Sequence, residues 1–136
     1  MTTVRYEGER LFGEPRVFTV DEEGRRSPLE HQVYYHSPAG FDWGYGGSGP
    51  AELALNLLLD ALEPAEIACT RCKGKGRYRG ERCYECRGLG IADAIWRAHH
   101  DFKWHFIAGL PEVRWSLERA DVVDWWRSNG ARAAVG

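Results

Sequence analysis

The chain has 136 residues, a hydrophobic content of 43%, a charged content of 28% and a formal net charge of −2. This length supports one domain with a modest core, and the composition is that of a folded chain rather than a disordered or fibrous one. No apolar run reaches the length of a membrane span, and the first residues form no apolar signal segment, so we expect a cytoplasmic protein with no membrane partner.

The first third of the sequence predicts three short β-strands. Residues 3–6, 16–20 and 32–36 are runs with β-branched or aromatic side chains, and turn-forming residues such as Gly8 and Gly13 separate them. A small antiparallel sheet is the simplest arrangement of such runs.

A glycine-rich segment, residues 40–50, contains the aromatic residues Phe41, Trp43 and Tyr45. A glycine-rich loop before a helix can bind phosphate, but the Gly-Lys-Ser or Gly-Lys-Thr of a P-loop is absent and Pro50 removes a backbone donor. We therefore expect the glycines to let the backbone pack among the aromatic side chains. The alternative is a groove of Phe41, Trp43 and Tyr45 for a peptide or a base.

A helix is predicted over residues 51–62, with Pro50 suited to its first turn after a cap at Ser48 or Gly49. The helix is apolar on nearly all sides, and it is interrupted only by Glu52, Asn56 and Asp60. Such a helix is buried within its own chain or by a partner, so a homodimer remains open.

All four cysteines of the chain lie in a repeat of Cys-x-x-Cys-x-Gly-x-Gly, which begins at Cys69 and Cys72 and recurs at Cys83 and Cys86. Two residues between cysteines let one tight turn direct both thiolates at one ion, and two such turns provide the tetrahedral ligand set that Zn²⁺ prefers. Because four protein ligands leave no open position, the repeat predicts one structural zinc ion.

Three other interpretations explain the repeat less well. Two disulfides need an oxidising compartment. A redox-active pair accounts for one Cys-x-x-Cys motif but not for its repetition. A [4Fe–4S] cluster also takes four thiolates, but closely spaced glycines favour one small ion. A module of this size has almost no apolar core, so the metal would supply its folding free energy.

The charge is distributed unevenly along the chain. Residues 69–90, which we call the finger, have seven basic and two acidic side chains, a net charge of +5; the remainder has 11 basic and 18 acidic side chains, a net charge of −7. We predict that the basic side chains of the finger bind a partner, with plain solubility of a coreless module as the alternative. They are Arg71, Lys73, Lys75, Arg77, Arg79, Arg82 and Arg87.

Beyond the finger, the pattern predicts a helix over residues 91–108, a short strand over 113–117 and a last helix from residue 116 or 117 to 128. The histidines form no His-Glu-x-x-His motif, so we expect them on the surface or in packing rather than in a site. They are His31, His36, His99, His100 and His105.

These elements predict an α+β fold in which a small antiparallel sheet packs on about three helices. Residues 1–68 and 91–136 would form one body, and residues 69–90 an inserted module. The finger separates two helices that would otherwise form a hairpin, and a pair of zinc knuckles brings the two ends of an insertion together.

The repeated motif of residues 69–90 resembles the cysteine-rich zinc domain of DnaJ-type chaperones, which has four such repeats and two zinc ions. Two repeats here imply one zinc ion. No His-Pro-Asp signature of a J-domain occurs in the chain, so the chaperone partnership of that family is not implied. The resemblance implies a module that contacts another macromolecule.

The body resembles a small bacterial and phage domain family of unknown function. The mark of that family is Gly-Phe-x-Trp-Gly-Tyr-Gly-Gly-Ser-Gly-Pro, here residues 40–50, followed by the Leu-Ala-Leu of 53–55. Later correspondences are Phe-Lys at 102–103 and Leu-Pro at 110–111. The resemblance implies no activity; it implies a phage or mobile-element setting.

Our first hypothesis is a non-enzymatic zinc-binding protein that contacts a protein partner with an acidic face, as an adaptor or an inhibitor. The second is a nucleic-acid-binding regulator, with the basic side chains on phosphates and Tyr78 or Tyr84 stacked on bases. The acidic body disfavours the second hypothesis. The third is an enzyme with its site at residues 40–50 and a base such as Asp42 or His36.

Overall fold

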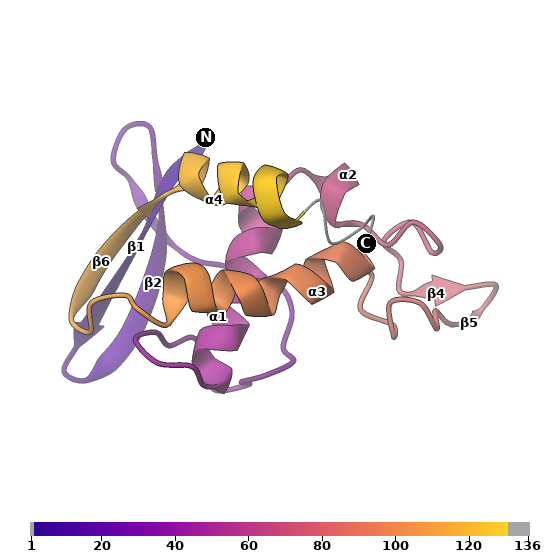
Figure 1. The fold of residues 1–136 in the computed structure, drawn as a ribbon, viewed down its shortest axis with the longest axis horizontal. Coiled ribbons are helices and arrows are strands. Elements are labelled where there is room, and N and C mark those ends of the chain that lie inside the picture. Colours follow the sequence, from indigo (N-terminus) through magenta and orange to yellow (C-terminus); the bar gives the residue numbers. More distant parts are fainter. Residues whose placement is uncertain (1, 131–136) are drawn as a thin grey trace.

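Four antiparallel strands form the sheet of the body, and they confirm the predicted α+β fold (Figure 1). The structure, a computed structural model, describes residues 2–130. The strands β1 (Thr3–Leu11) and β2 (Glu14–Asp21) form a hairpin, β3 (Arg26–Pro28) pairs with β2, and β6 (Arg114–Glu118) pairs with β1. The sheet lies at one end of the molecule, with the helices beside it and the finger at the opposite end.

Gly8 lies inside β1, so the expectation of a turn at this position is wrong. A Cβ atom at Gly8 would meet the indole ring of Trp115, on the neighbouring strand, at 2.2 Å. Glycine is therefore required because a ring packs over the strand, and not because the backbone turns. The turn follows later, at Phe12 and Gly13, whose φ angles are 53° and 80°.

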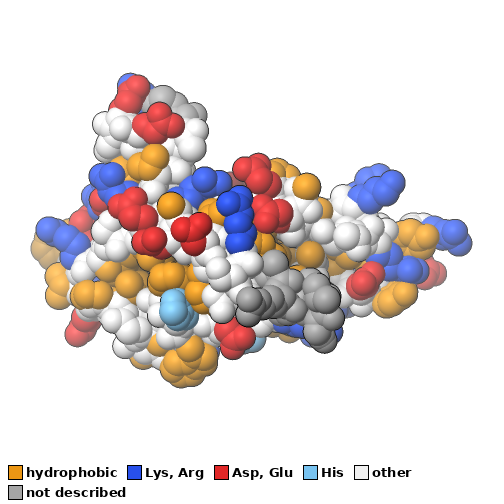
Figure 2. All heavy atoms as spheres, turned by 45° about the horizontal axis from the view of Figure 1, so that its top comes forward, with side chains coloured by type: hydrophobic (Ala, Val, Ile, Leu, Met, Phe, Trp, Pro, Cys, Tyr) orange, Lys and Arg blue, Asp and Glu red, His pale blue; other side chains and the backbone are white. Residues whose placement is uncertain are grey.

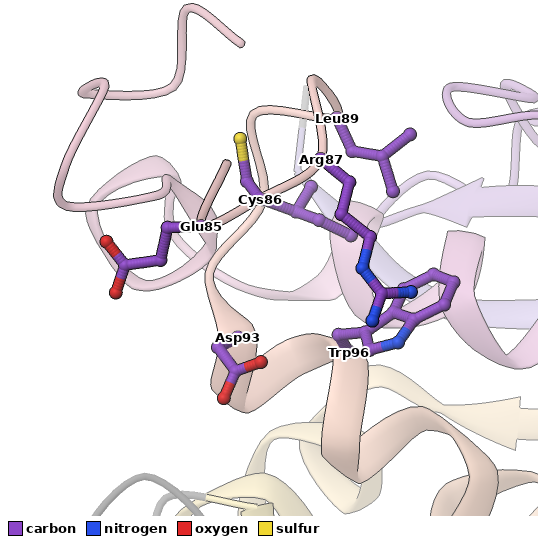
Figure 3. A pocket seen from close by; sticks show the side chains of 7 residues that line it. Glu85, Cys86, Arg87, Leu89, Asp93 and Trp96 are labelled. Carbon is purple, nitrogen blue, oxygen red and sulfur yellow. The ribbon is translucent and has the colours of Figure 1, made fainter. Parts of the chain in front are cut away.

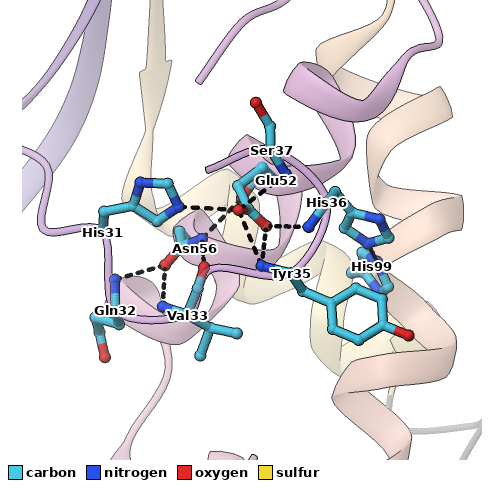
Figure 4. A network of polar contacts seen from close by, with 9 residues as sticks. All are labelled: His31, Gln32, Val33, Tyr35, His36, Ser37, Glu52, Asn56 and His99. Carbon is cyan, nitrogen blue, oxygen red and sulfur yellow. Dashed lines mark hydrogen bonds and ion pairs between the residues drawn. The ribbon is translucent and has the colours of Figure 1, made fainter. Parts of the chain in front are cut away.

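The strand predicted over residues 32–36 is also wrong, because this stretch is an irregular loop. Its backbone amides donate to side chains of a helix rather than to a neighbouring strand. Gln32 and Val33 donate to Oδ1 of Asn56 at 2.8 and 3.0 Å. Further along the loop, the backbone N–H of His36 donates to the carboxylate of Glu52 at 3.0 Å (Figure 4). These bonds satisfy amides that would otherwise need a sheet partner.

The helix α1 (Ser48–Ala61) is the central helix of the body, and Gly47 is its N-cap. Nearly all of its residues are buried, and Tyr6 of β1 donates to the carboxylate of Asp60 on this helix at 2.8 Å. Its apolar sides are thus covered within one chain, which removes the reason for expecting a dimer from this helix.

Three further helices complete the body: the short α2 (Pro64–Ile67), α3 (Asp93–Phe102), which packs against α1, and α4 (Arg119–Trp125). None of the helices within residues 2–130 is long and apolar enough to cross a membrane.

Two π-helical turns, η1 (Lys103–Ile107) and η2 (Trp126–Gly130), extend α3 and α4. Because a π-helical turn adds one residue, the buried position that follows Phe102 is Ile107, and not Phe106, which an α-helix would bury.

Candidate metal centre

The four cysteine side chains of the finger come together as predicted. All four are buried, and their sulfur atoms lie within 4.8 Å of one another. The Sγ atoms of Cys69 and Cys83 are 4.0 Å apart, and those of Cys72 and Cys86 are 3.6 Å apart. Four thiolates at about 2.3 Å from a tetrahedral zinc ion would have their sulfur atoms about 3.8 Å apart. The cluster can therefore hold one metal ion without rearrangement of its backbone.

The two knuckles have the same hydrogen bonds. In the first, Gly74 donates its backbone N–H to the carbonyl of Cys69 at 3.1 Å, and Gly76 donates to Sγ of Cys72 at 3.2 Å. The second knuckle repeats both bonds at the equivalent positions and at the same distances. An N–H···S bond stabilises a thiolate, the form of cysteine that binds metal.

The glycines of the repeat have two different roles. Gly74 and Gly88 have φ angles of 81° and 80°, which other residues rarely adopt. Gly76 and Gly90 have φ angles of 77°, and they also approach the opposite knuckle. A Cβ atom on Gly76 would lie 2.6 Å from the carbonyl oxygen of Gly88, and one on Gly90 would lie 2.6 Å from that of Gly74. The second glycine of each knuckle thus packs on the first glycine of the other.

The environment of the thiols differs across the cluster. Burial is the largest effect and raises the pKa of the Cys69 thiol. At Cys72 burial also acts to raise the pKa, but the N–H of Gly76 and the neighbouring thiols outweigh it and lower the pKa below its ordinary value. Between these two thiols, Cys72 is therefore the one that loses its proton more readily.

The basic side chains of the finger have no acidic partners. Arg71 is half-buried, and the other six are exposed. Within residues 2–130 no ion pair involves a finger residue, whereas body arginines such as Arg10 and Arg26 pair with carboxylates at 2.6 and 3.2 Å. In Figure 2 basic side chains stand out from the finger at the right, while both signs are interspersed over the body.

Arg71 lies between two tyrosine rings. Its guanidinium carbon is 4.2 Å from the ring centroids of both Tyr78 and Tyr84, and its Nε is buried without a hydrogen-bond partner. An open hollow of about 340 Å³ surrounds this stack, and Arg79 and Arg82 also line it. We call this the finger hollow. One acidic residue, Glu81, also lines it, but the three arginines outnumber it, so the hollow presents net positive charge beside aromatic surface, which suits an anionic group.

The finger joins the body through a short, closely packed connection. Ala68 and Ile91 form a β-bridge, so the two ends of residues 69–90 lie side by side, as an insertion requires. Leu89 packs against the body core, and the Arg87 side chain reaches toward the Trp96 indole (Figure 3). The cavity enclosed there is about 20 Å³, which leaves room for a single water molecule. This contact therefore connects the finger to the body, and the cavity is too small to bind a larger ligand.

The aromatic residues of segment 40–50 do not form an open groove. Trp43 is buried, and its Nε1 donates to the carbonyl oxygen of Glu112 at 2.9 Å. Phe41 is half-buried, and only Tyr45 is well exposed. The glycines instead serve packing, since a Cβ atom on Gly46 would lie 2.1 Å from the Trp104 ring.

Asp42, which we considered as a catalytic base, is held in a network. Its carboxylate accepts from the Arg10 guanidinium at 2.6 Å and from the Tyr45 hydroxyl at 3.0 Å. These contacts fix the loop before α1 to the sheet. The other candidate base, His36, contacts His99. The two candidate bases therefore contact different side chains.

A histidine cluster was missed by the sequence reasoning. His36, His99 and His100 place their ring nitrogens within 4.8 Å of one another, and Nε2 of His36 is 2.8 Å from Nε2 of His99. Burial, followed by the charge of His100, lowers the pKa of His99 to about 4. His36 lies 63 residues from His99, and no local spacing signals their proximity.

Comparison with known proteins gives one family. No curated protein and no solved structure matches the chain. A family model matches residues 6–73, half of the chain, from β1 through segment 40–50 and α1 to the first knuckle. The chain therefore belongs to this family, a family of unknown function designated DUF6166.

Proposed function

We propose that this chain is a non-enzymatic zinc protein whose finger binds a protein partner with an acidic face. The observation that carries the proposal is the set of seven basic side chains, on a module at the end of the body, that form no ion pair with any residue of the described range 2–130. Eight of the nine body arginines within residues 2–130 pair with carboxylates, so the finger retains a charge that a partner can neutralise.

Zinc is the metal that suits this cluster best. Four thiolates in two tight turns, with sulfur separations of 3.6 and 4.0 Å across the cluster, match a closed tetrahedral site. Such a site has no position for substrate, which supports a structural role. Thiolate ligands also suit a reducing compartment such as the cytoplasm, where disulfides are rare.

A protein partner is favoured over nucleic acid by the charge of the body. The body carries −7, so a phosphate backbone that extends beyond the finger would be repelled. The finger hollow offers planar guanidinium groups, Arg79 and Arg82, that can bind carboxylates in bidentate fashion. An adaptor or inhibitor encoded by a phage or mobile element would use such a surface.

The test is affinity capture from a nuclease-treated lysate of the source cells, with the zinc-loaded chain as bait. The variant is Arg77→Glu with Arg79→Glu, and the matched control is Arg16→Glu with Arg25→Glu, which reverses two exposed body arginines. Zinc content is measured for each. We expect one protein with an acidic surface to be retained in stoichiometric amount by the wild type and the control, and lost with the finger variant.

Fluorescent single- and double-stranded oligonucleotides are titrated in parallel across a salt series. Binding that weakens steeply with salt and disappears in the finger variant would replace the protein partner by nucleic acid. Equal retention of the captured protein by the finger variant would show that the finger is not the contact.

A further inference from the structure

The histidine cluster joins two separate parts of the body. His36 comes from the loop before α1 and His99 from α3 (Figure 4), and His100 follows His99 in α3. His99 is fully buried, His36 is half-buried and His100 is exposed. One side of the cluster is thus held in the core, while the other side opens to solvent and gives an ion a path of entry.

His99 is prepared as a ligand by its backbone contact. Its Nδ1 lies 2.5 Å from the carbonyl oxygen of Trp96, and a carbonyl can only accept, so Nδ1 carries the proton. The lone pair is therefore on Nε2, the atom directed at His36. Metal-binding histidines are commonly oriented by such a carbonyl contact. Burial lowers the pKa of His99 to about 4, which keeps the imidazole in the neutral, metal-binding form.

The distance between the ring nitrogens of His36 and His99 is close to that between two imidazole ligands of one metal ion. In a tetrahedral site two imidazole nitrogens lie about 3.4 Å apart. Without an ion, Nε2 of His36 donates its proton to Nε2 of His99 at 2.8 Å, so an ion must displace this proton and widen the separation by about half an ångström. His36 is anchored by its backbone N–H, which donates to the Glu52 carboxylate at 3.0 Å. His100 is exposed and can rotate toward the pair.

We propose that His36, His99 and His100 form a second metal site, for a divalent transition ion that imidazole binds. Unlike the cysteine cluster, this site has three protein ligands and leaves a position open to water or to another ligand. It is independent of the finger, because its ligands come from the body alone.

Lys103 limits the affinity of this site. It lies one helical turn after His99, it is buried, and its charge helps to lower the pKa of all three histidines. The same charge repels a bound cation. The ammonium nitrogen lies 4.6 Å from the Trp104 ring centroid, and this contact stabilises the charge. Replacement by the apolar Lys103→Met is therefore expected to tighten metal binding.

The experiment titrates Co²⁺ into untagged protein whose cysteine cluster is already loaded with zinc. For the same ligands Co²⁺ binds more weakly than Zn²⁺, so it does not displace zinc from the thiolates. Visible absorption reports cobalt coordination, and near-ultraviolet thiolate-to-cobalt absorption reports any exchange at the finger. Equilibrium dialysis gives the number of cobalt ions per chain.

We expect one cobalt ion per chain, without thiolate absorption. His36→Ala and His100→Ala should each weaken binding at least about tenfold, since removal of a direct ligand costs no less than removal of an outer partner. Lys103→Met should bind more tightly, and the control His105→Ala, which removes an exposed histidine outside the cluster, should bind as wild type does. Circular dichroism and zinc content show that each variant is folded. Equal affinities of the wild type and His100→Ala, or no cobalt bound by the wild type, would overturn the second site.

Discussion

The second glycine of each knuckle makes the contact that holds the two halves of the finger together. Gly76 packs on the carbonyl of Gly88, and Gly90 packs on that of Gly74. Each half of the repeat therefore needs the other, and this explains why both glycines recur in both halves. A single knuckle would have neither the second pair of thiolates nor the opposing backbone.

Replacement of Gly76 by alanine tests this contact against a matched control. Gly80 has a similar φ angle, 81°, but a Cβ atom there meets nothing within 4 Å. Gly80→Ala should cost only the backbone strain, about 1 kcal/mol. Gly76→Ala adds a steric clash, and we expect at least about a tenfold further loss of zinc affinity in competition with a chelator. Equal affinities of the two variants would contradict the proposed role of the contact.

At the residue scale, local spacing predicted the cysteine cluster but not the histidine cluster. A Cys-x-x-Cys turn carries its geometry within four residues, so the repeat can be recognised directly. His36 meets His99 only because the loop before α1 folds across α3. That proximity depends on tertiary packing, which the sequence pattern does not express.

The loop that precedes α1 is held by two buried polar side chains of that helix. The Glu52 carboxylate accepts from the backbone N–H groups of Tyr35, His36 and Ser37, and from the ring of His31. Burial alone would raise the pKa of Glu52, but these hydrogen bonds together lower it below its ordinary value. The helix therefore carries an ionised group in its interior, and that group determines the path of the loop.

Glu52→Gln should destabilise the body by about 2–4 kcal/mol at pH 7, because an amide cannot accept all of these bonds and its NH₂ faces other donors. The pKa is lowered in the folded state, so this stabilisation is present above the ordinary glutamate pKa of about 4.5 and is lost as the pH falls through the folded value. Urea unfolding at pH 7 and below pH 4 measures both effects.

The control for this measurement is Glu22→Gln, which changes an exposed glutamate outside the ion pairs of the described residues. We expect it to unfold as the wild type does at both pH values. A Glu52→Gln variant as stable as the wild type at pH 7 would show that the carboxylate does not hold the loop.

At the element scale, sequence patterns predicted three of the four α-helices and three of the four body strands approximately. They missed α2 and β3, and the strand predicted over residues 32–36 failed because side chains replace a sheet partner there. The aromatic and β-branched run at residues 32–36 resembles a strand. Its amides instead bind Glu52 and Asn56, which looked like mere interruptions of an apolar helix. Polar residues within an otherwise apolar helix were the sequence signal that a neighbouring loop would hydrogen-bond to this helix.

The molecule combines a body that has an apolar core with a finger whose buried residues are mainly its four cysteines. The core cluster contains residues of the sheet and of α1, α3 and α4, while the finger has a separate cluster of its four cysteines with Tyr78 packed against it. The β-bridge between Ala68 and Ile91 is compatible with the insertion of residues 69–90 that the repeat predicts. The order of the strands was not predictable, since β6 reaches β1 from more than 100 residues away.

Removal of zinc by a chelator should unfold the finger and leave the body intact. The finger has almost no apolar core, so metal binding supplies its folding free energy. Hydrogen exchange should show loss of protection for amides in residues 69–90 and retained protection in β1, β2 and α1. Loss of protection throughout the body would show that the two parts fold as one cooperative unit.

The most direct test of the metal centre is zinc K-edge X-ray absorption on protein that carries one equivalent of zinc. A closed site of Cys69, Cys72, Cys83 and Cys86 predicts four sulfur neighbours at about 2.3 Å and no lighter ligand. Nitrogen or oxygen atoms in the first shell would contradict a site made of these four thiolates, and the structural role of zinc in the finger would then have to be abandoned.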